Sequence, residues 1–190
     1  MSTSIKKLTL VGCCAVALSL GFGPDAQAGG PFGFGKNAST ADIAKIDIDV
    51  MPDGRGAPPG QGTYAEGKKV YAAQCASCHG ADMAKPVKGT GAAPLRGGRG
   101  TLTSGKPKKT VESYWPYAST LFDFTKRAMP FYEPGSMKDN DIYAVVAYIL
   151  AEGGIISKDT VMNAKTLANV KMPNRNGFIS DPRPDIFLYE

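Results

Sequence analysis

The residues that could do chemistry together are two cysteines and the histidine that follows them. Cys75 and Cys78 have two residues between them, and His79 comes next. Two thiols at this spacing could form a disulfide, supply half of a zinc site or attach a haem. The chain has one histidine and four cysteines, and the other two cysteines, Cys13 and Cys14, lie near its start. Few further ligands are therefore available to complete a metal site.

The histidine decides between these alternatives. A Cys-x-x-Cys-His run is typical of haem attachment, because thiols one helical turn apart can reach both vinyl groups of a porphyrin while the histidine faces the iron. A zinc site would need ligands that the processed chain lacks, and a thioredoxin-like dithiol would need a βαβ pattern. We therefore expect one covalent haem c, held by Cys75, Cys78 and His79.

The haem iron takes a second axial ligand, and the composition narrows the choice. With no second histidine and both thiols consumed, Met, Lys, Tyr or water remain. Met129 is the preferred candidate, because it ends an expected helix before Pro130 and begins a loop that can fold over the opposite haem face. Met137 is the rival, although its place beside a helix start suits a hydrophobic staple.

Helices on both sides of the cysteine motif must position these residues. A capping box of Thr63 and Glu66 predicts the start of the first helix, which runs into the motif. The second helix should begin at Pro116, a residue favoured at the first helical position. It should stop before Pro130, which disfavours helical geometry in the preceding residue.

The rest of the chain alternates between helix and irregular loop. A third helix is expected at residues 138–152, with Ser136 or Asp139 as its cap. Residues 80–109 contain many Gly, Pro and Lys residues without an apolar period, so they predict a long loop that a haem could order. A short helix is expected near residues 159–168, and no strand pattern of comparable strength is present. The predicted fold class is all-α.

The start of the chain predicts export. Lys6 and Lys7 precede an apolar run, and Ala26 and Ala28, with one residue between them, resemble a signal-peptidase site of the A-x-A kind. We expect residues 1–28 to be a cleaved signal peptide and the protein to be periplasmic. A retained anchor and lipidation at Cys13 are the alternatives, although the apolar run is short for either.

Length and composition favour one domain with appendages. A chain of 190 residues is long enough for a single core. Residues 29–61 read as a Gly/Pro-rich arm, residues 62–154 as the domain and residues 155–190 as a C-terminal extension. The formal net charge is +5, which is mildly basic, and no nucleic-acid-binding motif is present, so nucleic acid is not an expected partner.

Several segments resemble class I cytochromes c. They are the run 75–79, the tripeptide Ala93-Pro94-Leu95, the pair Met129-Pro130 and the run 141–150. The resemblance implies three to five helices around one covalent haem in residues 62–154. It implies that the carbonyl of Pro94 accepts a hydrogen bond from His79. It also implies that the first and last helices cross where three residues meet, namely Gly67, Tyr71 and Tyr148.

Residues 110–124, 127–131 and 171–178 are similar to the cytochrome subunits of sulfane or sulfite dehydrogenases from bacterial sulfur oxidation. This resemblance implies electron transfer from a molybdenum-cofactor dehydrogenase subunit to a soluble cytochrome c. The short apolar run before the cleavage site indicates that no stable membrane anchor is to be expected. A carrier for another periplasmic dehydrogenase or oxidase, and a haem enzyme or sensor with an open iron position, are the alternatives. Trp115 is a candidate to shield the haem or bind a propionate, with plain core as the alternative.

Overall fold

The computed structural model describes residue 32 and residues 34–180. The signal peptide expected at residues 1–28, with its alternative lipidation site, lies outside this described part. The chain divides into two units, residues 1–44 and residues 45–190. Within the described part, no helix is both long and apolar enough to span a membrane.

Helix α1 (Thr40–Ile46) crosses the boundary between the two units. At its start the backbone N–H of Asp42 donates to the hydroxyl of Ser39, and the backbone N–H of Ser39 donates to the carboxylate of Asp42. The helix buries none of its residues, and these hydrogen bonds stabilise its first turn.

The first predicted helix is confirmed as α2 (Tyr64–Gln74). Thr63 is the N-cap: its hydroxyl accepts the N–H of Glu66, and the Glu66 carboxylate accepts the N–H of Thr63. Two backbone donors that a helix start leaves without partners are thereby satisfied. The cysteine motif follows directly and forms the one-turn helix α3 (Ala76–His79).

The second predicted helix is α4 (Ala118–Ala128), which begins two residues later than the sequence indicated. Tyr117 is extended, with φ −136° and ψ 140°, and its ring lies 5.1 Å from the guanidinium of Arg175. The prediction of a start at Pro116 used only neighbouring residues and could not include this contact with a residue far away in the sequence. The end is as predicted, because Met129 precedes a proline and is extended, with φ −123° and ψ 148°.

The third predicted helix is α5 (Asp139–Glu152). Its N-cap is Lys138, without a side-chain capping hydrogen bond, so the caps expected from Ser136 and Asp139 are not formed there. The Asp139 carboxylate instead accepts a 2.6 Å hydrogen bond from Lys126 on α4. The ion pair between helices replaces the local cap.

The C-terminal part adds a small sheet and a helix. Strand β1 (Gln61–Gly62) pairs antiparallel with β2 (Met162–Asn163). Helix α6 (Ala164–Asn169) follows, and the Asn163 side chain accepts the N–H groups of Lys165 and Thr166. This helix is shorter than the one expected near residues 159–168. Strands of two residues are too short to produce an alternating pattern, so the sequence did not indicate them.

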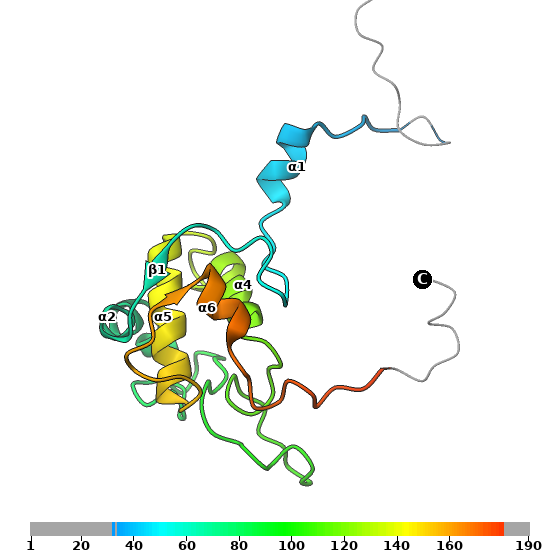
Figure 1. Cartoon of the computed structure of the whole chain (residues 1–190). Helices are drawn as coiled ribbons and strands as arrows, with labels where there is room; N and C mark the ends of the chain where they lie inside the picture. The colour runs from blue at the N-terminus through cyan, green and yellow to red at the C-terminus, as the bar shows by residue number, and fades with distance from the viewer. Residues whose placement is uncertain (1–31, 33, 181–190) are drawn as a thin grey trace, which may run out of the picture. The chain divides into compact units, whose positions relative to one another are not determined.

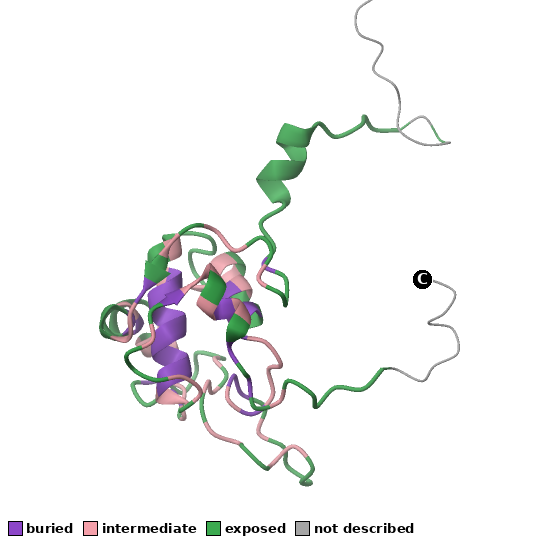
Figure 2. Cartoon of the chain, viewed as in Figure 1, coloured by how far each residue is buried: buried purple, intermediate pink, exposed green. Residues whose placement is uncertain are grey.

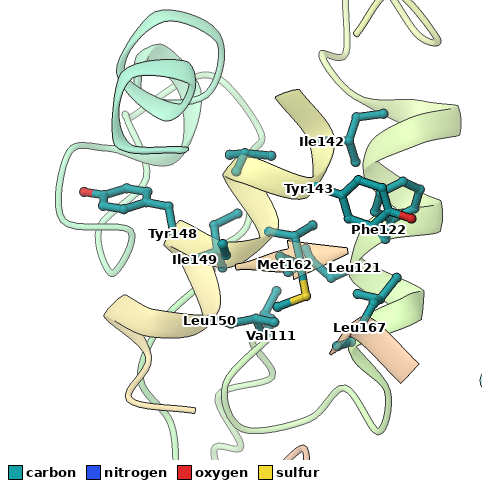
Figure 3. Packing of buried hydrophobic residues seen from close by; sticks show 14 of the residues in the cluster. Val111, Leu121, Phe122, Ile142, Tyr143, Tyr148, Ile149, Leu150, Met162 and Leu167 are labelled. Atoms are coloured by element: carbon teal, nitrogen blue, oxygen red, sulfur yellow. The ribbon is translucent and has the colours of Figure 1, made fainter. Parts of the chain in front are cut away.

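Helix α5 is central: α2 lies on one side of it, and α4 and α6 lie on the other (Figure 1). It is buried along most of its length (Figure 2), from Ile142 to Ala151. Tyr148 points toward α2, whereas Tyr143 packs on Phe122 of α4 with ring centroids 4.5 Å apart (Figure 3). The mostly helical fold that the sequence predicted is confirmed.

The crossing of α2 and α5 depends on a glycine. A Cβ atom on Gly67 would lie 1.8 Å from the carbonyl oxygen of Ala144 and 2.8 Å from Cβ of Tyr148. The rings of Tyr71 and Tyr148 pack beside it, with centroids 5.4 Å apart. The crossing implied by the family resemblance at these residues is therefore present in the structure.

The core extends beyond the expected domain of residues 62–154. Val50, which precedes that range, is buried with 6 % exposure, and its N–H donates to Asp123 on α4. Met162 and Leu167, which follow the range, are also buried in the core. Parts of the predicted arm and extension are thus packed into the same compact unit, because the helices alone leave apolar surface that these segments cover.

Candidate cofactor site

A cavity of about 810 Å³ opens beside α5. One side, here called the helix wall, comes from the end of α2, the cysteine motif and α5. Its residues include Gln74, Cys75, Cys78, His79, Val145 and Ile149. Another side, here called the loop wall, comes from residues 109–115 and 129–137. Residues 90–95 and the inner face of α4 complete the lining.

The helical turn of the motif places its three functional residues on one wall. The N–H groups of Cys78 and His79 both donate to the carbonyl of Cys75, at 3.1 and 2.9 Å. Both thiols are free, so they do not form a disulfide. Burial, with a contribution from Cys78, raises the pKa of the Cys75 thiol to about 11. The motif thus offers two thiols and an imidazole to one ligand.

The imidazole of His79 is held by a backbone carbonyl. Its Nδ1 lies 2.9 Å from the carbonyl oxygen of Ala93. A carbonyl only accepts hydrogen bonds, so Nδ1 carries the proton and Nε2 keeps a lone pair for a metal. The family resemblance had implied the carbonyl of Pro94 as acceptor, and the structure corrects this by one residue. Pro94 restricts Ala93 to an extended backbone, and Pro94 itself lines the cavity.

The chain turns sharply after His79. Gly80 has φ +76°, and a Cβ on it would lie 2.2 Å from the carbonyl oxygen of Lys85, so only glycine fits this turn. The buried hydroxyl of Tyr71 donates to the Gly80 carbonyl at 2.7 Å. Val87 returns to the motif by donating its N–H to the carbonyl of Cys78. These contacts order part of the long loop that the sequence left irregular.

Both candidate methionines line the cavity. Met129 is the C-cap of α4 and directly follows its last turn. Met137 also packs against the hydrophobic core and borders a separate hollow of about 440 Å³ beside α2. The structure therefore brings both thioethers to the site, and Met137 has a packing role that Met129 does not share.

Trp115 also lines the cavity, and its ring meets the ring of Phe124 edge to face, 5.8 Å away. Lys109 and Arg127 line the cavity as well, although the sequence did not place either of them at this site. Lys109 lies over the ring of Tyr114, with Nζ 5.0 Å from the centroid, and Arg127 pairs with Asp123. No local pattern places these two residues at the cavity, because their position depends on the folding of distant segments.

Comparison with known proteins agrees with this geometry. The family model for cytochrome c matches residues 64–152. A chain in the crystal structure of the sulfane dehydrogenase SoxCD from Paracoccus pantotrophus is similar in fold, with a TM-score of 0.73 and 37% sequence identity. The match covers 84% of this chain and 78% of that chain. This chain belongs to the cytochrome c family.

A cytochrome c is an electron carrier with a covalent haem c, and the cavity fits that group. Its size lies within the roughly 300–1,000 Å³ usual for cofactor sites. The motif of Cys75 and Cys78 supplies the thiol pair, and Nε2 of His79 has the lone pair that the iron needs. In the described part of the chain, no group of three or more His, Cys, Asp or Glu side chains could hold a different metal. Haem c is the cofactor of this cytochrome.

A second relative is the thiosulfate dehydrogenase of Stutzerimonas stutzeri (strain A1501). The two sequences are 33% identical over 93 residues, which is 48% of this cytochrome. The matched region spans only 28% of that relative's own length. The likeness therefore concerns one part of a longer protein.

Proposed function

We propose that this cytochrome is the haem subunit of a periplasmic, molybdenum-dependent dehydrogenase that oxidises sulfane or sulfite. In this proposal the sulfur chemistry takes place in a separate subunit, and the cytochrome passes the electrons to a soluble cytochrome c. The supporting observation is the 37% identity with a chain of sulfane dehydrogenase SoxCD over 84% of this chain. That match extends well beyond the cytochrome c region of residues 64–152.

We further propose the ligand set. Cys75 and Cys78 form the two thioether bonds, His79 is one axial ligand and Met129 is the other. When bound, haem c supplies a one-electron ferric/ferrous couple whose potential depends on ligands, burial and hydrogen bonds. The hydrogen bond from Nδ1 of His79 to Ala93 orients the imidazole and increases its basicity.

The remaining residues of the site control how far water and redox partners can approach the haem. Val145 and Ile149 of the helix wall are buried, with 0 % and 7 % exposure, and they exclude water from that side. Phe131 and Tyr132 of the loop wall have 72 % and 81 % of their surface exposed. This asymmetry supports electron exchange at the loop wall, because the transferred electron has the shortest path where the cofactor cavity is least covered.

Purification of the native complex tests the proposal. The cytochrome is isolated from periplasm at low ionic strength, and molybdenum and haem are assayed in the same fractions. We expect molybdenum to co-elute with haem, and sulfite or a sulfane-sulfur compound to reduce the haem in those fractions. A monomeric cytochrome that no molybdenum protein reduces would contradict the assignment.

The similarity to thiosulfate dehydrogenase supports a second candidate, in which the electrons come from thiosulfate. The same fractions distinguish the two. Reduction of the haem by thiosulfate in fractions without molybdenum would favour the second candidate, whereas reduction that follows the molybdenum content favours the first.

A further inference from the structure

Two segments far apart in the sequence meet at the loop wall. One is residues 109–117, which contributes Lys109, Val111 and Trp115 to the cavity lining. The other is residues 170–178, here called the C-terminal strap, which lies beyond the cytochrome c region of residues 64–152. The strap continues from α6 and is drawn in orange to red in Figure 1.

The strap touches residues 109–117 at three points. The side-chain amide of Asn174 donates a 2.7 Å hydrogen bond to the backbone carbonyl of Tyr114. The ring of Phe178 meets the ring of Tyr114 edge to face, with centroids 5.2 Å apart. The guanidinium of Arg175 lies over the ring of Tyr117, 5.1 Å from its centroid. The contacts thus bracket Trp115, which follows Tyr114.

The strap itself is well anchored. Val170 and Met172 are buried in the core, with 7 % and 4 % exposure. The N–H of Gly177 donates to the carbonyl of Asn174, and a Cβ on Gly177 would lie 1.8 Å from Oδ1 of Asn174. The turn therefore closes over the Asn174 side chain. The side-chain amide of Asn174 is thereby held near the Tyr114 carbonyl.

The segment that the strap holds has little regular structure of its own. It is ordered locally by Thr110 and Ser113, whose side chains each accept the other residue's backbone N–H. These bonds act at one end, before Trp115. At the other end, Tyr117 caps α4, the helix that leads to Met129. A shift of this segment would move Trp115 and the start of α4 together.

We propose that Asn174 and Phe178 are positioning residues that keep Trp115 against the cofactor cavity and thereby set the reduction potential of the haem. Their action is indirect, through Tyr114. If the strap releases Tyr114, residues 114–115 move outward and water enters the cavity. Water favours the ferric state, which carries one more positive charge, so the potential falls.

The composition provides a selective probe, because Trp115 is the sole tryptophan of the chain. A haem in the cavity quenches tryptophan emission by energy transfer, so the fluorescence of the holoprotein reports the distance and orientation of Trp115. We expect Asn174→Ala and Phe178→Ala each to increase this emission and to lower the potential measured by redox titration. A tenfold change in the ferric-to-ferrous ratio at fixed poise would correspond to about 59 mV for one electron.

Two further variants serve as controls. Asn176→Ala changes an exposed residue of the same strap, and we expect wild-type emission and potential. Phe178→Tyr keeps the ring against Tyr114 and should also retain both. Phe178 is 51 % exposed, so its replacement by alanine leaves no buried cavity, and holoprotein should form even if Asn174→Ala fails to mature.

A purely stabilising strap would behave differently. In that case Phe178→Ala would lower the melting temperature while emission and potential stay at wild-type values, and the proposal would be wrong. Equal effects of Phe178→Ala and Asn176→Ala would also contradict it. Neither readout depends on the sulfur substrate or on a partner subunit, so the result is independent of the proposed dehydrogenase assignment.

Discussion

The two walls of the cavity are built on different principles. The helix wall rests on the crossing of α2 and α5, where the backbones meet at Gly67 and Ala144 and water is excluded. The loop wall has no such helix crossing. Residues 109–117 are ordered by side-chain hydrogen bonds and by the C-terminal strap. The helix wall fixes the positions of the two thiols and the imidazole. The loop wall covers the cavity, and its position depends on contacts with other segments.

Because of this difference, haem attachment and control of the haem reduction potential depend on different walls. Residues that attach the haem need a geometry defined by one helical turn, which short-range hydrogen bonds provide. Residues that control its potential act through solvent access and the second axial ligand, and both depend on how loops are held. Mutations in the helix wall should therefore affect folding first, and mutations in the loop wall should affect spectra and potential first.

The largest expected effect is on the helix wall, from Gly67→Val. The new side chain would collide with the carbonyl of Ala144, which is backbone and cannot move aside. Overpacking commonly costs 1 to 3 kcal/mol, and here we expect about 3 kcal/mol or more. The yield of haem-bearing protein and its thermal unfolding followed by circular dichroism measure this. Gly105→Ala is the control, because a Cβ there meets no atom within 4 Å; a Gly67→Val protein as stable as this control would disprove the tight crossing.

The second prediction concerns the loop wall. Met129→Ala should remove the methionine-to-iron charge-transfer band of the ferric protein, produce high-spin features and lower the potential, because a thioether ligand favours ferrous iron. Met137→Ala should keep the band and lose stability only, since Met137 packs against the core. The reverse pattern would exchange the two roles. High-spin spectra in wild type and Met129→Ala alike would instead indicate an open iron position.

The third prediction concerns Glu152, which connects the end of α5 to neighbouring segments by a hydrogen bond and ion pairs. Glu152, at the end of α5, accepts a 2.7 Å hydrogen bond from Tyr64 and faces Lys158 and Arg96. The hydrogen bond from Tyr64, followed by the interaction with Lys158, holds the pKa of Glu152 below its ordinary value of 4.5. Its stabilising contribution is therefore fully present above that value and is lost as the pH falls through the lowered pKa.

Glu152→Gln removes this titration. The free energy of unfolding at neutral pH should decrease by up to about 1 kcal/mol, because the glutamine oxygen can still accept from Tyr64 and only the ion pairs with the partly exposed Lys158 and Arg96 are lost. Denaturant unfolding between pH 3 and pH 7, a range of about four units around the ordinary carboxyl pKa, should show a shallower pH dependence in the variant. Parallel pH profiles for wild type and variant would argue that Glu152 contributes nothing through its charge.

The smallest effect is expected within α4. The hydroxyl of Ser119 is buried and has no hydrogen-bond partner among the described residues. Removing it in Ser119→Ala should leave stability unchanged or increase it by up to about 1 kcal/mol. Ser113→Ala in the loop wall is the matched comparison, because that hydroxyl donates to the carbonyl of Lys108 at 2.6 Å. Its loss should cost about 1 to 3 kcal/mol, and equal melting temperatures for the two variants would contradict this contrast.

Local signals predicted two of the helix ends well. The Thr63 and Glu66 capping box located the start of α2, and the proline after Met129 located the end of α4. Both signals act within four residues, so the sequence contains all the groups involved. The start of α4 was placed at Pro116 instead of Ala118, where a contact from Arg175 takes part. The prediction failed where a distant residue took part.

The sequence by itself determined the cofactor chemistry. Cys75, Cys78 and His79 are neighbours along the chain, and one helical turn is enough to bring them together. Only the tertiary structure decided that Ala93 accepts the hydrogen bond of His79, that the strap holds Tyr114 and that Met137 shares the cavity with Met129. Those contacts join residues many positions apart whose types have no local periodicity, so they exist only once α2, α4 and α5 have packed around a common core.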